Sequence, residues 1–225
     1  MKGLALFIVC LPFSPIGLVN PFFGMMYYNL FALIKPEWVF YGFPKFPSIP
    51  WIIGGATFLG WICSREPKLP TFDSTTWLVI ALIVWGGITT FFALDSNISV
   101  TKYNLMIKIY IFALVMYCML TTTWRIQVAF WVLGLSIAAW GTKGGLNAFI
   151  TGGKRVYGPD HSVISDNNDF AIVLATVLPL LVVLRGMCTE QWKRHGISLI
   201  IGFNVICLIQ HGFLVALLHQ IVDST

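Results

Sequence analysis

Charged residues are scarce in this chain. Asp, Glu, Lys and Arg together make up 10% of its 225 residues, whereas soluble domains carry about a quarter. Apolar residues account for 57% of the sequence, and the mean hydropathy is +0.82. The composition argues against a soluble protein and predicts an all-α, polytopic integral membrane protein whose first partner is the lipid bilayer.

Several signatures of chemistry are also missing. The five cysteines form no CxxC pair, which argues against a zinc site or a disulfide framework. The sequence has no HExxH, no Walker sequence and no Ser-His-Asp order. The net charge of +5 is spread over many loops without a basic run, so nucleic acid is not an expected partner. No cofactor is expected.

Apolar stretches separated by polar or proline-bearing turns predict one membrane domain, residues 1–225, with about seven or eight transmembrane helices. The first two stretches, 4–18 and 21–34, are each too short to cross a bilayer core of roughly 30 Å. They form either a hairpin of tilted helices or one broken span. The remaining helices are predicted at about 51–63, 77–94, 103–121, 126–140, 170–184 and 197–222. Lys102 and Lys108, near the start of the fifth span, are expected to snorkel to the membrane interface.

The distribution of cations gives a weak preference for one orientation. Strict alternation of the segments divides the Lys and Arg residues eight against six, too evenly for the positive-inside rule to decide. The smaller set lies in tight turns, which favours the cytoplasmic side for these residues: Arg65, Lys68, Arg125, Arg185, Lys193 and Arg194. This orientation places residues 151–169 outside the cytoplasm.

Residues 141–169 are predicted to form a polar loop between two apolar helices. A polar concentration of this kind costs stability in a membrane protein unless it faces water or a charged ligand. The glycines at 141, 144 and 145 are expected to loosen the chain and let backbone amides approach a ligand. Lys154 and Arg155 follow, and a guanidinium suits bidentate binding of phosphate oxygens. Arg155 as a simple interfacial anchor is the equal alternative.

The acidic residues of this loop have competing interpretations. Asp166 is a good N-cap for the next helix, with Asp169 three residues on in a capping-box-like arrangement. Asp160, His161, Asp166 and Asp169 are oxygen-rich and clustered, as ligands of a divalent cation would be, but their spacing matches no calcium loop. No metal is therefore expected. His161 is a possible general base, although loop histidines are more often simply solvated.

Four pieces of the sequence resemble a known family. They are SREPK at 64–68, FALD at 92–95, GTKGGLNAFITGGKRVYGP at 141–159 and DNND at 166–169, and their order and spacing also agree. In these pieces the chain resembles the N-terminal half of the exosortase A-associated putative O-glycosylation ligases, members of the O-antigen ligase and polymerase superfamily. The similarity covers about residues 1–200.

The resemblance implies a multi-pass protein of the bacterial inner membrane. Such enzymes transfer a glycan from a polyprenyl pyrophosphate carrier to an acceptor hydroxyl on the periplasmic side, without a metal or nucleotide sugar. It further implies that Arg155 binds the pyrophosphate and that Asn168 is the asparagine of the family's Gly–Asn-rich turn. The expected substrate-binding residues are Lys154, Arg155, Tyr157 and Asn168.

The resemblance also has departures. Family members continue into a large periplasmic loop and further helices with a second arginine and the histidine proposed as the base, whereas this sequence ends at Thr225. The C-terminal catalytic half is thus expected to be missing, and no catalytic residue is assigned. The alternative hypothesis is a non-catalytic structural subunit that packs against other subunits of a larger membrane complex.

Overall fold

The computed structural model describes residues 15–35, 49–151 and 167–210, and all regular structure in these residues is helical. Five described helices are long and apolar enough to cross a membrane. They are α6 (Ser74–Phe91), α7 (Ser96–Met119), α8 (Thr123–Thr151), α9 (Asn167–Met187) and α10 (Gln191–Gln210). Three shorter apolar helices precede them: α2 (Ile16–Val19), α3 (Pro21–Ile34) and α5 (Ile49–Cys63). The predicted all-helical membrane fold is confirmed at this level.

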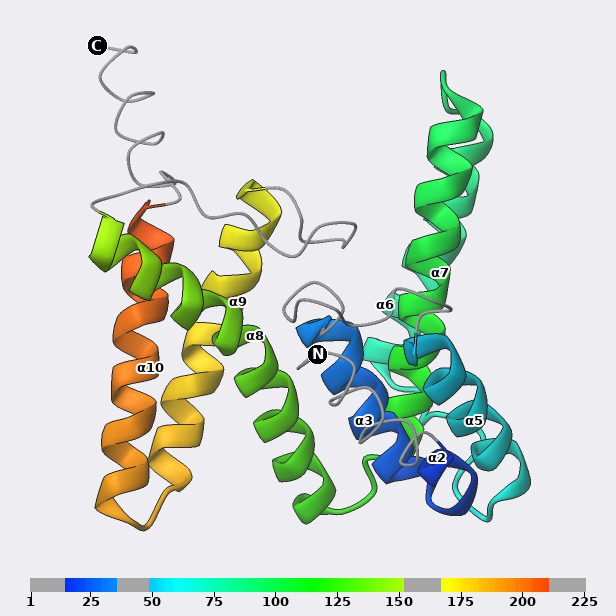
Figure 1. Cartoon of the computed structure of the whole chain (residues 1–225). Helices are drawn as coiled ribbons and strands as arrows, with labels where there is room; N and C mark the ends of the chain where they lie inside the picture. The colour runs from blue at the N-terminus through cyan, green and yellow to red at the C-terminus, as the bar shows by residue number, and fades with distance from the viewer. Residues whose placement is uncertain (1–14, 36–48, 152–166, 211–225) are drawn as a thin grey trace.

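The helices alternate in direction between two ends of the molecule (Figure 1). The turns after α5, α7 and α9 lie at one end, which we call the Arg125 end. The last turn of α8, the first turn of α9 and the last turn of α10 lie at the opposite end, which we call the Thr151 end. Residues distant in sequence are therefore gathered at the two ends of the bundle.

Side-chain caps explain where several helices begin. The side chain of Asn20 accepts a hydrogen bond from the amide of Phe23, 3.3 Å away, and Pro21 occupies the first helical position. Asp73 and Asp95 cap α6 and α7 in the same way, each accepting from an amide three residues ahead. These caps satisfy amides that the first turn of a helix cannot pair internally.

The short helices pack through glycines. A Cβ atom added to Gly60 of α5 would lie 2.0 Å from the carbonyl oxygen of Gly17 in α2, and one added to Gly24 of α3 would lie 2.3 Å from the Cα of Gly17. Real Cβ atoms do not approach that closely, so any larger residue would push the helices apart. Small residues at such contacts allow membrane helices to approach backbone to backbone.

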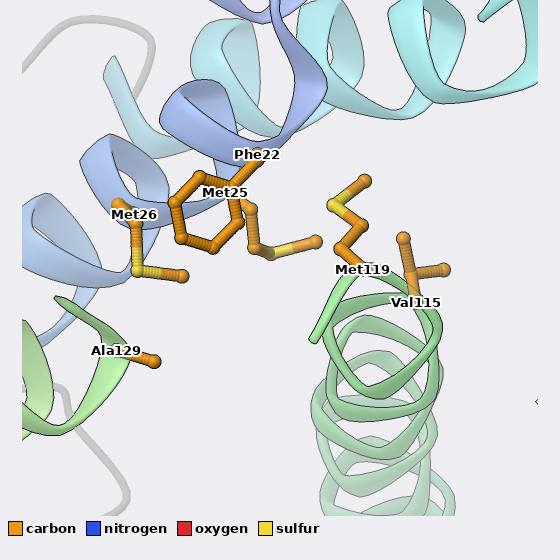
Figure 2. Close-up of a cluster of buried hydrophobic side chains, with 6 residues drawn as sticks. All are labelled: Phe22, Met25, Met26, Val115, Met119 and Ala129. Atoms are coloured by element: carbon orange, nitrogen blue, oxygen red, sulfur yellow. The ribbon is translucent and has the colours of Figure 1, made fainter. Parts of the chain in front are cut away.

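The core that joins α3 to the longer helices is rich in methionine. Figure 2 shows side chains of α3, α7 and α8 that meet there: Phe22, Met25, Met26, Val115, Met119 and Ala129. Methionine adapts to irregular gaps between helices because its side chain is unbranched and flexible. A second apolar contact joins α8, α9 and α10, and it includes the buried side chains of Val177, Leu181, Leu184 and Ile197.

Helices α6 and α7 form a hairpin that is largely exposed. The Tyr103 hydroxyl donates to the carbonyl oxygen of Ile83 at 2.9 Å and lies against Gly86 and Gly87. Elsewhere the hairpin exposes large apolar groups; Trp77 is 58% accessible and Phe91 is 85% accessible. Surfaces of this kind suit the hydrocarbon of a bilayer.

The main difference from the predicted helices is at the end of α8. The helix runs to Thr151, so residues 141–151 are helical and not part of the polar loop that we expected to begin at residue 141. The glycines of this segment were interpreted as loop residues because glycine weakens helices in water. In the structure Gly141, Gly144 and Gly145 are buried, and two of them are positions of close helix packing.

Candidate functional site

The last turns of α8 and the first turn of α9 flank residues 152–166 at the Thr151 end (Figure 1). Six of the predicted site residues fall between these helices and lie outside the described residues: Lys154, Arg155, Tyr157, Asp160, His161 and Asp166. The structure therefore defines the helices on both sides of the candidate site, and the two ends to which the segment is attached.

Close contact with α10 fixes the position of the C-terminal part of α8. A Cβ atom on Gly145 would lie 1.9 Å from the carbonyl oxygen of Phe203, and one on Gly141 would lie 2.0 Å from Oδ1 of Asn204. Gly141 and Gly145 are four residues apart and so lie on the same face of α8. They have GxxxG spacing: Gly145 lets the backbones of α8 and α10 approach closely, and Gly141 leaves room for the side chain of Asn204.

Asn204 links α10 to α8 at the same level. Its side chain is fully buried, and its amide nitrogen lies 3.2 Å from the carbonyl oxygen of Ala138 and 3.2 Å from Oγ1 of Thr142. The same nitrogen lies 2.8 Å from the carbonyl oxygen of Ile200, in the preceding turn of α10. A buried amide that binds both helices holds them in register, since sliding one helix would leave it unpaired.

An aromatic residue connects α8 to the N-terminal helices. The indole Nε1 of Trp140 donates to the carbonyl oxygen of Leu33 at 3.1 Å, near the end of α3. The ammonium of Lys143 lies 4.9 Å from the centroid of the Trp140 ring, a cation–π contact. Lys143 is exposed and forms no ion pair with a described carboxylate, so it adds positive charge to the Thr151 end.

The first turn of α9 holds the other two predicted site residues. Asn168 lies in this turn, and Asp169 follows it with an exposed side chain. The helix begins at Asn167, directly after Asp166, as expected for a cap at that position, although the side chain of Asp166 is outside the described residues. Phe170 is fully buried next to Leu174 and Cys207, so the start of α9 is anchored to α10.

At the Arg125 end several cations are held by acceptors of the chain itself. Arg125 forms a bidentate pair with Glu66, with Nη2–Oε1 at 2.7 Å and Nη1–Oε2 at 2.8 Å, and Nη1 also donates to the carbonyl oxygen of Met119. The side chains of Arg125 and Glu66 are 22% and 18% accessible. Hydrogen bonds from Arg125 hold the pKa of Glu66 below its usual value. The pair joins the α5–α6 turn to the start of α8.

Neighbouring polar groups of this end are also partnered. The ammonium of Lys68 donates to the carbonyl oxygens of Trp61 and Ser64. The Tyr117 hydroxyl donates to Asp73 at 2.9 Å. The pKa of Asp73 is lowered, first by the hydrogen bond from the Thr76 amide and then by that from Tyr117. These contacts satisfy the polar groups involved without a ligand, which indicates a structural role for them.

Sequence reasoning missed the long-range contacts that hold the helices together. Nothing in the spacing of Glu66 and Arg125, which are 59 residues apart, predicts their pairing. The only available signal was that Glu66 belongs to the SREPK piece of the resemblance. Asn204 was visible as a polar residue within an apolar helix, a common sign of a contact between membrane helices. Within the described residues, no cluster of three or more His, Cys, Asp or Glu side chains suits a metal ion.

Comparison with known proteins gives a family without a known activity. No curated protein matches the chain. No solved structure matches it either. Residues 1–188, which include the Glu66–Arg125 pair, all of α8 and all of α9, match a family of unknown function, DUF5935. Because the match spans most of the sequence, this chain belongs to the DUF5935 family.

Proposed function

We propose that this protein is an O-antigen ligase-like component of the bacterial inner membrane that binds a polyprenyl-pyrophosphate-linked glycan around Arg155. One observation carries the proposal. The helices on both sides of residues 152–166 end at the same face of the bundle, and Gly141, Gly145 and Asn204 fix α8 against α10 there. We propose that the cation-bearing segment attached to these two helices meets the lipid-linked anion at this end.

The chemistry of the segment fits a pyrophosphate. Arg155 offers two parallel N–H donors to phosphoryl oxygens, and Lys154 adds a second positive charge. Lys143, in the last turns of α8, contributes further positive potential at this end. Tyr157 and Asn168 are proposed to bind the glycan or the phosphate through their polar groups. The proposed reaction, as in the O-glycosylation ligases that the chain resembles, is transfer of the glycan to an acceptor hydroxyl.

The finer topology belongs to the same proposal. Seven or eight spans are proposed, in which the short helices α2, α3 and α5 complete the five membrane-length helices. The Arg125 end is proposed to be cytoplasmic, since it collects Arg65, Arg185 and Arg194 as well as Arg125 itself. The Thr151 end is then periplasmic, where lipid-linked glycans are used.

Binding of a fluorescent polyprenyl pyrophosphate to the purified full chain tests the proposal. Arg155→Ala is expected to weaken binding by at least tenfold, because a hydrogen bond to a charged group contributes about 1.5–3 kcal/mol. Arg194→Ala is the matched control, since Arg194 is an exposed arginine at the opposite end. Equal binding by both variants and the wild type, or no binding by the wild type, would contradict the proposal.

A structural subunit is the second candidate, and the α6–α7 hairpin favours it. Within the described chain this hairpin packs mainly on itself and exposes large aromatic side chains along its length. Aromatic residues are enriched where membrane and soluble proteins meet their partners. Native sizing after mild extraction separates the candidates: a subunit remains with fixed partner polypeptides, whereas a lipid-binding ligase relative is recovered alone with lipid.

A further inference from the structure

One face of α7 changes from polar to apolar along its length. Asn97, Thr101, Asn104 and Lys108 follow one another at spacings of four, three and four residues, which places them on a single face of the helix. All four side chains are exposed in the described structure. We call these four residues the α7 polar face.

The same face is part of the protein core nearer the Arg125 end. Val115 lies seven residues after Lys108, about two helical turns along the same face, and it is buried together with Met119 against α3 and α8 (Figure 2). Phe112, between them, stacks on Tyr28 of α3 with ring centroids 4.3 Å apart. The α7 polar face therefore continues a surface that packs on other helices, and it is not the side of α7 that faces away from the rest of the bundle.

Lys108 lies far from both ends of α7. It comes twelve residues after Ser96 and eleven before Met119, which is about 16–18 Å from either end at 1.5 Å per residue. The snorkelling predicted for Lys108 would have to cover a large part of this distance, and it stays a prediction. Its ammonium lies 4.6 Å from the centroid of the Trp51 ring, at the start of α5.

A cation at mid-span is costly in hydrocarbon and normally marks a wet or functional site. No described carboxylate forms an ion pair with Lys108. Asn104, Thr101 and Asn97 follow one another from Lys108 to the start of α7, which lies at the Thr151 end. Residues 152–166 are attached at the same end. Amide and hydroxyl groups spaced along one face can hydrogen-bond to water, phosphoryl oxygens or sugar hydroxyls.

We propose that the α7 polar face is in contact with water and binds the phosphoryl oxygens of the lipid-linked substrate, with Lys108 as the cation at its deep end. This inference rests on the proposed function and adds a second binding element to it, on a different helix from Arg155. The polyprenyl chain stays in the surrounding hydrocarbon, while the phosphate accepts hydrogen bonds from Lys108 and the side-chain amide of Asn104. The Thr101 hydroxyl donates to the carbonyl oxygen of Asn97 at 2.9 Å, so it offers an acceptor to the water of this face.

The first experiment measures water contact without a ligand. Asn104→Cys and Met106→Cys are made separately in the full chain with Cys10 and Cys63 replaced by serine. Met106 is a matched control because it is also exposed and lies two residues away, on nearly the opposite side of α7. In intact membranes a membrane-impermeant maleimide is expected to label the Asn104→Cys variant at least tenfold faster. Equal or absent labelling of both variants contradicts the proposal.

The second experiment measures binding of a fluorescent polyprenyl pyrophosphate to the purified full chain. Lys108→Met is expected to weaken binding about tenfold, as loss of one charge-assisted contact predicts, and Lys108→Arg is expected to retain most of it. Lys102→Met is the control, since Lys102 is an exposed lysine of the same helix that lies off the α7 polar face.

The outcomes separate the two proposals. Binding that is weakened by Arg155→Ala but unchanged by Lys108→Met overturns the role of Lys108 and leaves the proposed function in place. Loss of binding with Lys108→Met but not Lys102→Met supports the inference. A wild-type chain that binds no polyprenyl pyrophosphate overturns both.

Discussion

The two ends of the bundle treat positive charge differently. At the Arg125 end, Arg125 is paired with Glu66, Lys193 with Glu190, and Arg185 donates to Ser198. Lys143, toward the Thr151 end, and Lys108, midway along α7, contact tryptophan rings and form no ion pair with a described carboxylate. Polar groups that are satisfied within the chain stabilise the fold, whereas cations without acceptors remain available for an anionic ligand. On this difference rests our proposal that the Thr151 end binds the ligand, although Arg65 and Arg194 at the Arg125 end also form no ion pair with a described carboxylate.

The largest expected effect comes from disrupting the contact between α8 and α10 near the Thr151 end. Gly145→Leu is expected to destabilise the protein by about 3 kcal/mol or more, because its first side-chain atom would lie 1.9 Å from the Phe203 carbonyl oxygen and would force α8 from α10. The measurement is thermal unfolding in detergent, followed by tryptophan fluorescence. Gly202→Ala is the control: nothing lies within 4 Å of the added Cβ atom, so it is expected to be neutral or slightly stabilising. Similar stability of both variants would show that the close contact is not what holds this end.

A smaller effect is expected from breaking the ion pair of the Arg125 end. Glu66→Gln leaves a partly buried guanidinium without its carboxylate and is expected to cost about 2 kcal/mol of stability, less than the 3–5 kcal/mol typical of fully buried pairs. Binding of polyprenyl pyrophosphate by the folded variant is expected to remain unchanged. A variant that is as stable as the wild type but binds the lipid weakly would reverse the assignment of the two ends.

The same pair predicts a dependence of stability on pH. The pKa of Glu66 is lowered in the folded protein from 4.5, chiefly by hydrogen bonds from Arg125. A carboxyl group with a depressed folded pKa stabilises the protein fully above its unfolded pKa, and this contribution is lost as the pH falls through the folded pKa. Melting temperatures measured from pH 7 to pH 3 are therefore expected to fall less steeply for Glu66→Gln than for the wild type.

The smallest effect concerns the hydrogen bond between α8 and α10. Thr142→Val removes one acceptor of the Asn204 amide but leaves the Ala138 and Ile200 carbonyl oxygens in place. The expected cost is about 0.6 kcal/mol, the average for such bonds between membrane helices. Thr176→Val is the control, since that exposed hydroxyl bonds only within its own helix. Equal shifts in melting temperature would argue against a specific link between α8 and α10.

Local signals in the sequence predicted much of the fold. The apolar stretches gave the all-helical membrane class, and the predicted stretch 21–34 has the bounds of α3. The same signals failed at residues 141–151, because glycine favours loops in water but close packing between membrane helices. Deciding whether these glycines form a loop or a close helix contact requires knowing which surface of α10 packs on them. The sequence of α8 alone does not contain that information.

The candidate site was predictable only in part for the same reason. The segment around Arg155 stands out as a polar interruption between apolar helices, and the structure describes the helices that flank it. The depth of Lys108 depends on where α7 begins, and the pairing of Glu66 with Arg125 depends on how distant turns meet. Long-range contacts of this kind arise from tertiary packing, which residue spacing alone does not encode.

Native mass spectrometry of the chain, released from mildly extracted membranes, tests the central claim most directly. The account predicts a single polypeptide carrying a polyprenyl pyrophosphate species, with the lipid lost from Arg155→Ala and kept by Arg194→Ala. A fixed set of partner polypeptides, with no such lipid on either variant or the wild type, would contradict the account and assign the Thr151 end to assembly.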